Sequence, residues 1–153
     1  MTAEQSSRVF TESAFGPPLI GALLRMPLET VRQHMLDRLH EHGFDDLEPS
    51  HLIVVQYHGP QGTRPSELAA RLRISKQALN YLLGQLERLG YLTREPDPDD
   101  QRSKRIVLTP RAESAVPVIR NAVAEIESEW SRQLGPERFA ELRGLLVELN
   151  RLL

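Results

Sequence analysis

Apolar residues recur at helical spacing near the start of the chain. Between Pro17 and Leu39 they step by three or four positions, at Ile20, Leu24, Leu28, Val31, Met35 and Leu39. This spacing places them on one face of a helix. Pro27 lies inside the pattern and removes a backbone donor, so we expect a kink or a break there. Gly43 follows the pattern as a helix C-cap residue would.

The carboxy-terminal third has the same periodicity. One stripe consists of Val116, Ile119, Val123, Ile126 and Trp130. After Gly135-Pro136 a second stripe consists of Phe139, Leu142, Leu145, Leu146, Leu149, Leu152 and Leu153. We expect Pro117 to bend the first of these helices. Pairing the apolar faces at both ends of the chain across a two-fold axis would bury them, which predicts a homodimer. An intrachain bundle of three helices is the alternative.

The middle of the chain predicts three short helices. Glu48-Pro49-Ser50 opens the first, which runs through Tyr57 to the turn Gly59-Pro60-Gln61-Gly62. Pro65 suits the first position of the next, which runs from Ser66 to Arg71 or Leu72. Ser75 is a good N-cap for a third helix that ends near Leu89, with Gly90 as its stop. The last two, joined by about three residues, form a helix-turn-helix candidate.

The two faces of this third helix differ in chemistry. The inward positions are Leu79, Leu82, Leu83, Leu86 and Leu89, and the outward ones are Gln77, Asn80, Tyr81, Gly84 and Arg88. The outward set contains no carboxylate. A helix that enters the major groove must offer polar groups to base edges without repelling phosphates. A polar face is also what any amphipathic surface helix has, so this helix alone does not decide the function.

A β-hairpin is expected next. Tyr91 to Glu95 and Lys104 to Thr109 have strand-forming residues, and Pro96 to Ser103 is rich in turn residues. A hairpin directly after a helix-turn-helix is the winged-helix arrangement. Its acids are Asp97, Asp99 and Asp100, which could form a metal or acid–base cluster. The better interpretation is that they cap turn amides and pair with Arg102 or Lys104. At a wing tip, Arg102 is a natural probe of the minor groove or of phosphates.

Composition and charge narrow the class of protein. The 153 residues correspond to one or at most two compact units, with 19 basic against 21 acidic residues. Residues 62–109 hold nine basic and six acidic residues, so a basic centre lies between acidic flanks. Cys is absent, which excludes disulfides, thiolate chemistry and Cys-ligated zinc. The apolar runs are too short to span a membrane and the start does not resemble a signal peptide, so a soluble cytoplasmic protein is expected.

Catalysis and metal binding have little support. The sequence contains no nucleophile elbow, phosphate-binding Gly-rich loop or dinucleotide fingerprint, so we expect neither an enzyme nor a cofactor. A metal-responsive protein is one alternative, and its candidate ligands are His34, His40, His42, His51, His58, Asp45, Asp46 and Glu48. No tight ligand spacing occurs among them. A winged helix used only for protein docking is the other alternative.

In this order, the elements resemble the MarR family of dimeric winged-helix transcriptional regulators, from about Pro17 to Leu153. The resemblance rests on Ser66-Glu67-Leu68-Ala69-Ala70-Arg71-Leu72, Ser75-Lys76-Gln77, Leu86 to Arg94, and the wing signature Asp97, Asp100, Arg102, Leu108 and Thr109. It implies a dimer through the terminal helices, with the helix from Ser75 in the major groove. Asn80 and Tyr81 depart from residues common at recognition positions, and Asp99 stands where many members are basic. Members often sense small aromatic ligands between the dimer helices and the DNA-binding lobe.

These inferences combine into one expectation for fold and function. The fold is mainly α with a small β-hairpin wing, divided into a mobile arm (1–16), an N-terminal dimerisation helix (17–48), a winged helix-turn-helix (49–109) and C-terminal dimerisation helices (110–153). The expected function is a ligand-responsive repressor that binds a pseudopalindrome in double-stranded DNA as a homodimer. The expected DNA-binding residues are Arg64, Ser75, Lys76, Gln77, Asn80, Tyr81, Arg102 and Lys104. Among them Arg64, Lys76 and Lys104 are assigned to phosphates, Gln77, Asn80 and Tyr81 to bases, and Arg102 to the minor groove. Asp97 and Asp100 are assigned to shaping the wing.

Overall fold

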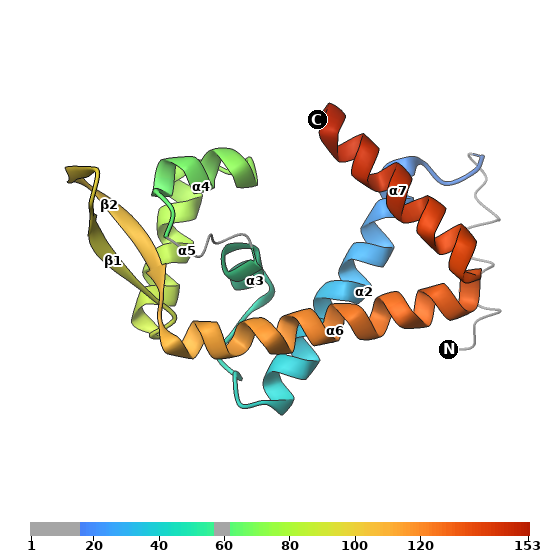
Figure 1. Ribbon diagram of the computed structural model, residues 1–153, viewed down its shortest axis with the longest axis horizontal. Helices are drawn as coiled ribbons and strands as arrows, with labels where there is room; N and C mark the ends of the chain where they lie inside the picture. The colour runs from blue at the N-terminus through green and yellow to red at the C-terminus, as the bar shows by residue number, and fades with distance from the viewer. Residues whose placement is uncertain (1–15, 57–61) are drawn as a thin grey trace.

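The computed structural model describes residues 16–56 and 62–153 (Figure 1). Its elements are α2 (Ile20–Glu41), α3 (Pro49–Gln56), α4 (Pro65–Leu72), α5 (Lys76–Arg88), β1 (Leu92–Asp97), β2 (Asp100–Leu108), α6 (Pro110–Leu134) and α7 (Pro136–Leu152). The expected fold, mainly helical with a two-stranded wing, is confirmed. The proposed arm falls outside the described residues except for Gly16, as do Tyr57 and most of the turn after it. Among the described residues, none of the helices is long and apolar enough to cross a membrane.

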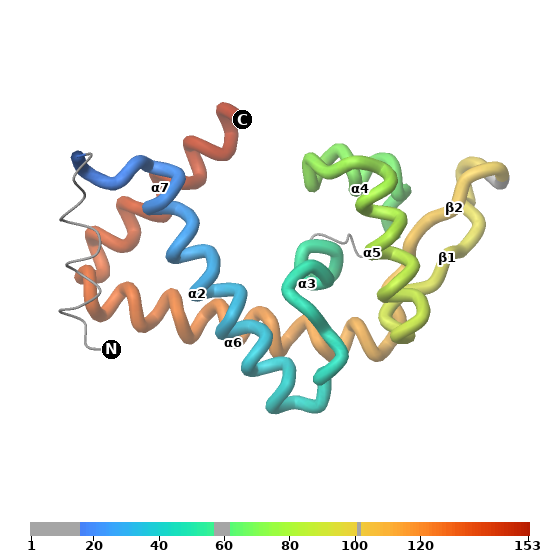
Figure 2. The backbone as a smooth tube through the Cα atoms, turned by 180° about the vertical axis from the view of Figure 1, so that it is seen from behind, coloured from blue at the N-terminus to red at the C-terminus, as the bar shows by residue number. Residues whose placement is uncertain are grey.

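Helix α2 is continuous where a break was expected. It begins at Ile20 instead of Pro17, and Leu19 before it is in an extended conformation. Pro27 lies inside the helix, so of the kink or break expected there the break is wrong. Loss of one backbone hydrogen bond does not end the helix, whose second half is anchored by the buried side chains of Met35, Leu36 and Leu39. Figure 2 shows this helix crossing α6, with which it is in contact.

The helix-turn-helix forms at the predicted positions. Pro65 is the first residue of α4, and the Ser75 Oγ accepts a hydrogen bond of 3.0 Å from the Ala78 amide at the start of α5. Arg73 ends α4 in the left-handed region with φ 53°. Leu79, Leu83 and Leu86 are buried, and Leu82 and Leu89 are partly buried, so the inward face of α5 is confirmed.

The wing has longer strands than expected. β1 and β2 are antiparallel, and Pro96 pairs with Lys104, so most of the predicted loop belongs to the strands. The register shifts between Pro96 and Asp97, which accommodates a proline that cannot donate to the ladder. Only Pro98 and Asp99 remain between the strands. Thr63, just before α4, bridges to Ile106 and joins the wing to the helix-turn-helix.

The chain closes with two helices of unequal burial. α6 starts at the Thr109 cap and continues through Pro117, so that proline does not interrupt it. α7 follows the break at Gly135 and has no buried residue. The core instead lies around α3, α5, the wing base, the second half of α2 and the first half of α6. α2 and α7 both contact α6, and α7 and the first half of α2 leave large apolar side chains exposed.

Candidate nucleic-acid interface

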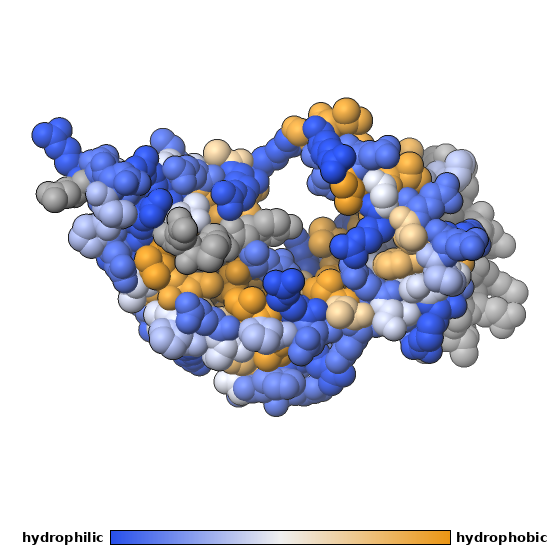
Figure 3. Space-filling view, in the orientation of Figure 1, coloured by the Kyte–Doolittle hydropathy of each residue, from blue (hydrophilic) through white to orange (hydrophobic). Residues whose placement is uncertain are grey.

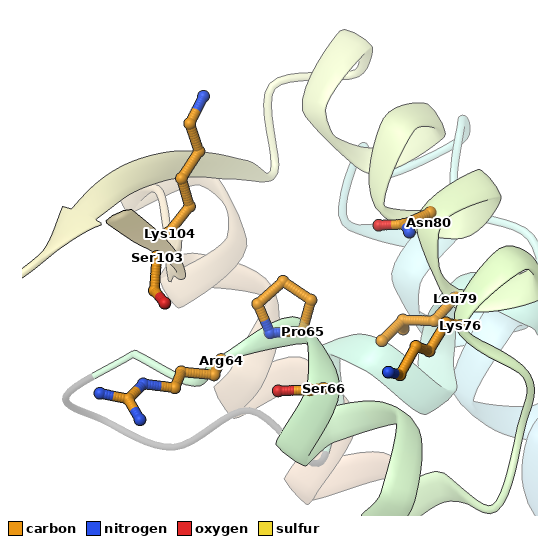
Figure 4. Close-up of a pocket in the computed structure, with 8 residues that line it drawn as sticks. All are labelled: Arg64, Pro65, Ser66, Lys76, Leu79, Asn80, Ser103 and Lys104. Atoms are coloured by element: carbon orange, nitrogen blue, oxygen red, sulfur yellow. The ribbon is translucent and has the colours of Figure 1, made fainter. Parts of the chain in front are cut away.

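A shallow groove lies where α4, α5 and the wing meet (Figure 4). Its volume is about 270 Å³ and it is lined by Arg64, Pro65, Ser66, Lys76, Leu79, Asn80, Ser103 and Lys104. Figure 4 shows the Asn80 amide facing the groove from α5 and the Lys104 side chain rising from β2. Three of the basic residues assigned to phosphates therefore surround one surface. Polar groups beside several cations are suited to binding a polyanion.

The outward face of α5 presents the side chains assigned to bases. Gln77, Asn80 and Tyr81 are all exposed, and Tyr81 has 67% of its surface accessible. The one acid within α5, Glu87, points to the wing and pairs with Arg94 at 3.1 Å. The outward face of α5 that carries Gln77, Asn80 and Tyr81 is therefore polar and free of carboxylates. It lies directly beside the cationic groove, which Asn80 also lines.

Asp97 has different partners from those expected. Its carboxylate is buried and lies 2.5 Å from the Arg64 Nε and 3.6 Å from the Arg105 Nε, so the pairing with Arg102 or Lys104 is wrong. The register shift turns this side chain inward, toward the residue that precedes α4. The hydrogen bond from Arg64, helped by the Asp99 amide, holds the pKa of Asp97 below its usual value. Arg64 thus stabilises the wing, while about a third of its side chain stays exposed.

Asp100 shapes the wing tip as a turn cap. Its carboxylate accepts hydrogen bonds from the Arg102 amide at 3.0 Å and from the Ser103 hydroxyl at 2.7 Å. These bonds, that from Ser103 above all, lower the pKa of Asp100. The capping role expected for the wing acids is confirmed here. The side chains of Arg102 and Lys104 remain exposed on the same hairpin.

A buried tyrosine anchors the end of α5, and sequence reasoning missed it. The Tyr91 hydroxyl donates to Asp46 at 2.6 Å, and the Arg111 guanidinium lies 4.4 Å from the centre of the Tyr91 ring. Arg111 also pairs with Asp46 and donates to the Leu89 carbonyl at 2.6 Å. Burial, and then the hydrogen bond to Asp46, raise the pKa of Tyr91. This network ties the end of α5 to the start of α6 and to the loop after α2.

The histidines proposed as metal ligands are dispersed. His34 pairs with Glu125 at 2.8 Å, His40 lies 3.4 Å from the Leu47 carbonyl and His42 lies 2.7 Å from the Arg38 carbonyl. His51 is buried, and its Nδ1 accepts a hydrogen bond of 3.1 Å from the Glu48 amide. Across residues 16–56 and 62–153, no group of three or more His, Asp or Glu side chains is placed to hold a metal ion. His58 lies outside these residues.

The helix-turn-helix, the hairpin that follows it and the groove between them define a winged helix protein. Residues 42–103 match the model of the MarR family. It is similar to YkoM of Bacillus subtilis (strain 168), an uncharacterized HTH-type transcriptional regulator, with 35% identity over 81 residues. That match spans 53% of this chain and 51% of the relative, so the chain covers about half of the curated protein.

Solved structures share the fold over most of the chain. The transcriptional regulator Tm0710 from Thermotoga maritima is 27% identical with a TM-score of 0.55, over 86% of this chain and 92% of that one. The complex of S. aureus MepR with DNA is 24% identical with a TM-score of 0.69, over 89% of this chain and 99% of MepR. At that identity the MepR likeness concerns the fold alone. It does show that this fold occurs on DNA in at least one protein.

Proposed function

We propose that this protein is a cytoplasmic transcriptional regulator that binds double-stranded DNA in a sequence-specific way. One observation carries the proposal: the carboxylate-free outer face of α5 lies beside a groove lined by Arg64, Lys76 and Lys104. The MarR family and the fold are those of transcriptional regulators, so we infer that the protein acts by binding and not by catalysis. The DNA complex of MepR, which has the same fold, supports this use of the surface.

In the proposed complex, affinity and sequence choice come from different residues. Lys76, Lys104 and the exposed part of Arg64 contact phosphates, which contribute most of the binding free energy. Gln77, Asn80 and Tyr81 contact base edges in the major groove. Arg102, at the exposed tip of the wing, reaches the adjacent minor groove. Ser75 caps α5, and Asp97 and Asp100 hold the wing in the shape that this contact requires.

We further propose that two copies associate through α2 and α7. The first half of α2 exposes Ile20, Leu23, Leu24 and Leu28, and α7 exposes Leu142, Leu145, Leu149 and Leu152. Figure 3 shows apolar residues on the surface near the carboxy-terminal end of α7. A dimer would cover these faces and present two α5 helices to one duplex. Two-fold symmetry then implies a pseudopalindromic operator with half-sites about one helical turn apart.

A response to a small aromatic ligand completes the proposal. A crevice of about 790 Å³ lies among α3, α6 and α7, with apolar walls from Val55, Val116 and Ile119 and polar groups from Gln56, Arg120 and Asn121. Apolar walls with a few polar groups are typical of small-molecule sites. A ligand there would shift the α5 helices of the dimer relative to each other and release a repressed operator. Melting curves with benzoates and phenols test for such a ligand.

Selection of duplexes from a random library, followed by binding measurements at several salt concentrations, tests DNA binding. The expected result is an enriched palindromic motif whose affinity falls steeply as salt rises, because phosphate contacts release counterions. The absence of any enriched motif would overturn the proposal and favour the docking-module alternative. An affinity that does not depend on salt would contradict the assigned phosphate contacts.

A further inference from the structure

A series of hydrogen bonds joins the start of α3 to the exposed face of α5. The Glu48 amide donates to the Nδ1 of His51 at 3.1 Å, and the Nε2 of His51 lies 3.4 Å from the Oε1 of Gln85. The Nε2 of Gln85 then donates to the hydroxyl oxygen of Tyr81 at 3.4 Å. His51 is 1% exposed and Tyr81 is 67% exposed, so the series runs from the core to the outer surface.

The Glu48 amide, as the first donor, determines which partner donates and which accepts in every later hydrogen bond of the series. A backbone amide can only donate, so the Nδ1 of a neutral His51 accepts and its ring proton sits on Nε2. That proton requires an acceptor, which fixes the side-chain amide of Gln85 with Oε1 toward His51. The NH₂ group of Gln85 therefore faces Tyr81. The Tyr81 oxygen accepts this bond, so the hydroxyl proton must point elsewhere.

We propose that His51 and Gln85 are positioning residues that make Tyr81 a hydrogen-bond donor toward a base. This inference rests on the proposed function, in which the face that carries Tyr81 lies in the major groove. There, guanine, adenine and thymine each present an acceptor, whereas cytosine presents only its amino donor. Tyr81 therefore discriminates against cytosine at one position of each half-site. Neither His51 nor Gln85 needs to touch DNA for this effect.

Replacement of the Gln85 amide by a carboxylate tests the direction of the hydrogen bonds in the series. In Gln85→Glu the side chain can only accept, so the Tyr81 hydroxyl donates to Glu and offers lone pairs outward. The preference at that position should then turn toward the amino groups of cytosine and adenine. Duplex selection measures the preference of the wild type and the variant. We expect wild-type discrimination of roughly three- to tenfold, the effect of one hydrogen bond.

Tyr81→Phe, alone and combined with Gln85→Glu, is the matched control. Tyr81→Phe should lose the discrimination at that one position, and the double variant should have the same preference there as Tyr81→Phe. Any general loss of affinity caused by the added negative charge appears with and without the hydroxyl, and so is separated from the change in preference. Should Gln85→Glu not fold, Gln85→Leu replaces it, with loss of discrimination as the expected result.

Three results would overturn the inference. Gln85→Glu, or Gln85→Leu in its place, could keep the wild-type preference; Tyr81→Phe could select the same motif as the wild type; or the change caused by Gln85→Glu could persist without the Tyr81 hydroxyl. In each of these results the wild type still selects a motif, so DNA binding stands. If the wild type selects none, the proposed function itself fails, and this inference fails with it.

Discussion

The Arg64 Nε lies 2.5 Å from the Asp97 Oδ2, which ties the residue before α4 to the end of β1. These two residues stand on either side of the junction between the helix-turn-helix and the wing. Arg105 of β2 lies near the same carboxylate, at 3.6 Å. The Asp97 carboxylate, which joins the two sides of the groove, is therefore buried, while Lys76 and Lys104 stay exposed at the groove surface.

Acid should weaken this junction. Because the folded protein lowers the pKa of Asp97, the pair stabilises the fold above the unfolded value of about 3.9 and loses that contribution as the pH falls through the lower, folded value. Asp97→Asn should therefore be less stable than the wild type near neutral pH, and the difference should shrink as the pH falls below about 4. Urea denaturation across this range measures both curves.

Asp99→Asn is the control for that experiment, since it removes the same charge from an exposed position in the turn. Its stability at neutral pH should stay within about 0.5 kcal/mol of the wild type. An Asp97→Asn variant as stable as Asp99→Asn would show that the Arg64 pair contributes nothing to the fold.

The two exposed lysines of the groove should act through charge alone. Lys76→Ala and Lys104→Ala should each reduce the slope of log affinity against log salt by about 1, without changing the selected motif. Gln77→Ala should do the opposite, with an altered motif and an unchanged slope. Fluorescence anisotropy with the selected duplex measures the slopes, and selection measures the motifs. A changed motif in either lysine variant would mean that the lysine reads bases.

The cap of α5 offers a way to separate stability from binding. Ser75→Ala removes the acceptor of the Ala78 amide and should cost about 1 kcal/mol of unfolding free energy. Ser75→Asp retains an acceptor, so its stability should stay near that of the wild type, but its negative charge beside DNA should lower affinity. Urea denaturation and duplex titration together distinguish the two variants. Equal stability of all three proteins would contradict the capping role.

The buried tyrosine should contribute through its hydroxyl. Tyr91→Phe removes the hydrogen bond to Asp46. Burial raises the pKa of Asp46, but the hydrogen bond from Tyr91 and the charge and hydrogen bond of Arg111 lower it, and the pKa lies below its usual value overall. Loss of a hydrogen bond to a charged group should reduce the unfolding free energy by about 1–2 kcal/mol. Tyr81→Phe, at an exposed position, should change it by less than about 0.5 kcal/mol. Urea denaturation of the two variants in parallel gives the comparison.

The terminal apolar faces should control oligomeric state. Leu145 of α7 is 57% exposed, and a glutamate there would place a charge inside the proposed dimer interface. Leu145→Glu should weaken dimerisation at least about tenfold in sedimentation equilibrium, and cooperative DNA binding should fall with it. Thr93→Glu adds the same charge on the exposed wing and should leave the dimer intact. A dimer unaffected by Leu145→Glu would place the interface elsewhere.

Local signals predicted the element boundaries well where the interactions are themselves local. Ser75 caps α5 through an amide three residues away, and Gly90 and Gly135 end helices with φ of 78° and 90°. Pro27 shows the limit of such signals. Its local cost is real, but packing of the helix against α6 decides the outcome.

Long-range partners could not be read from the sequence. Asp97 meets Arg64 only because a register shift turns its side chain inward, and that shift follows from strand pairing. Tyr91 joins Asp46 and Arg111 from separate elements, with no motif to connect them. The surface of the site was predictable because exposed polar residues on one helix face follow from periodicity alone. The bonds beneath that surface depend on the folded arrangement.

Helix α6 has a mechanical consequence for the proposed dimer. Its 25 residues form one rod of about 37 Å between the wing and α7. Insertion of one residue would lengthen the rod by about 1.5 Å and rotate one end against the other by about 100°. In the proposed dimer, the distance and the relative rotation between the two α5 helices therefore depend on the length of α6. In that dimer, a change in the length of α6 would alter the spacing of the half-sites that fit, whereas a change on the outer face of α5 would alter the bases that are contacted.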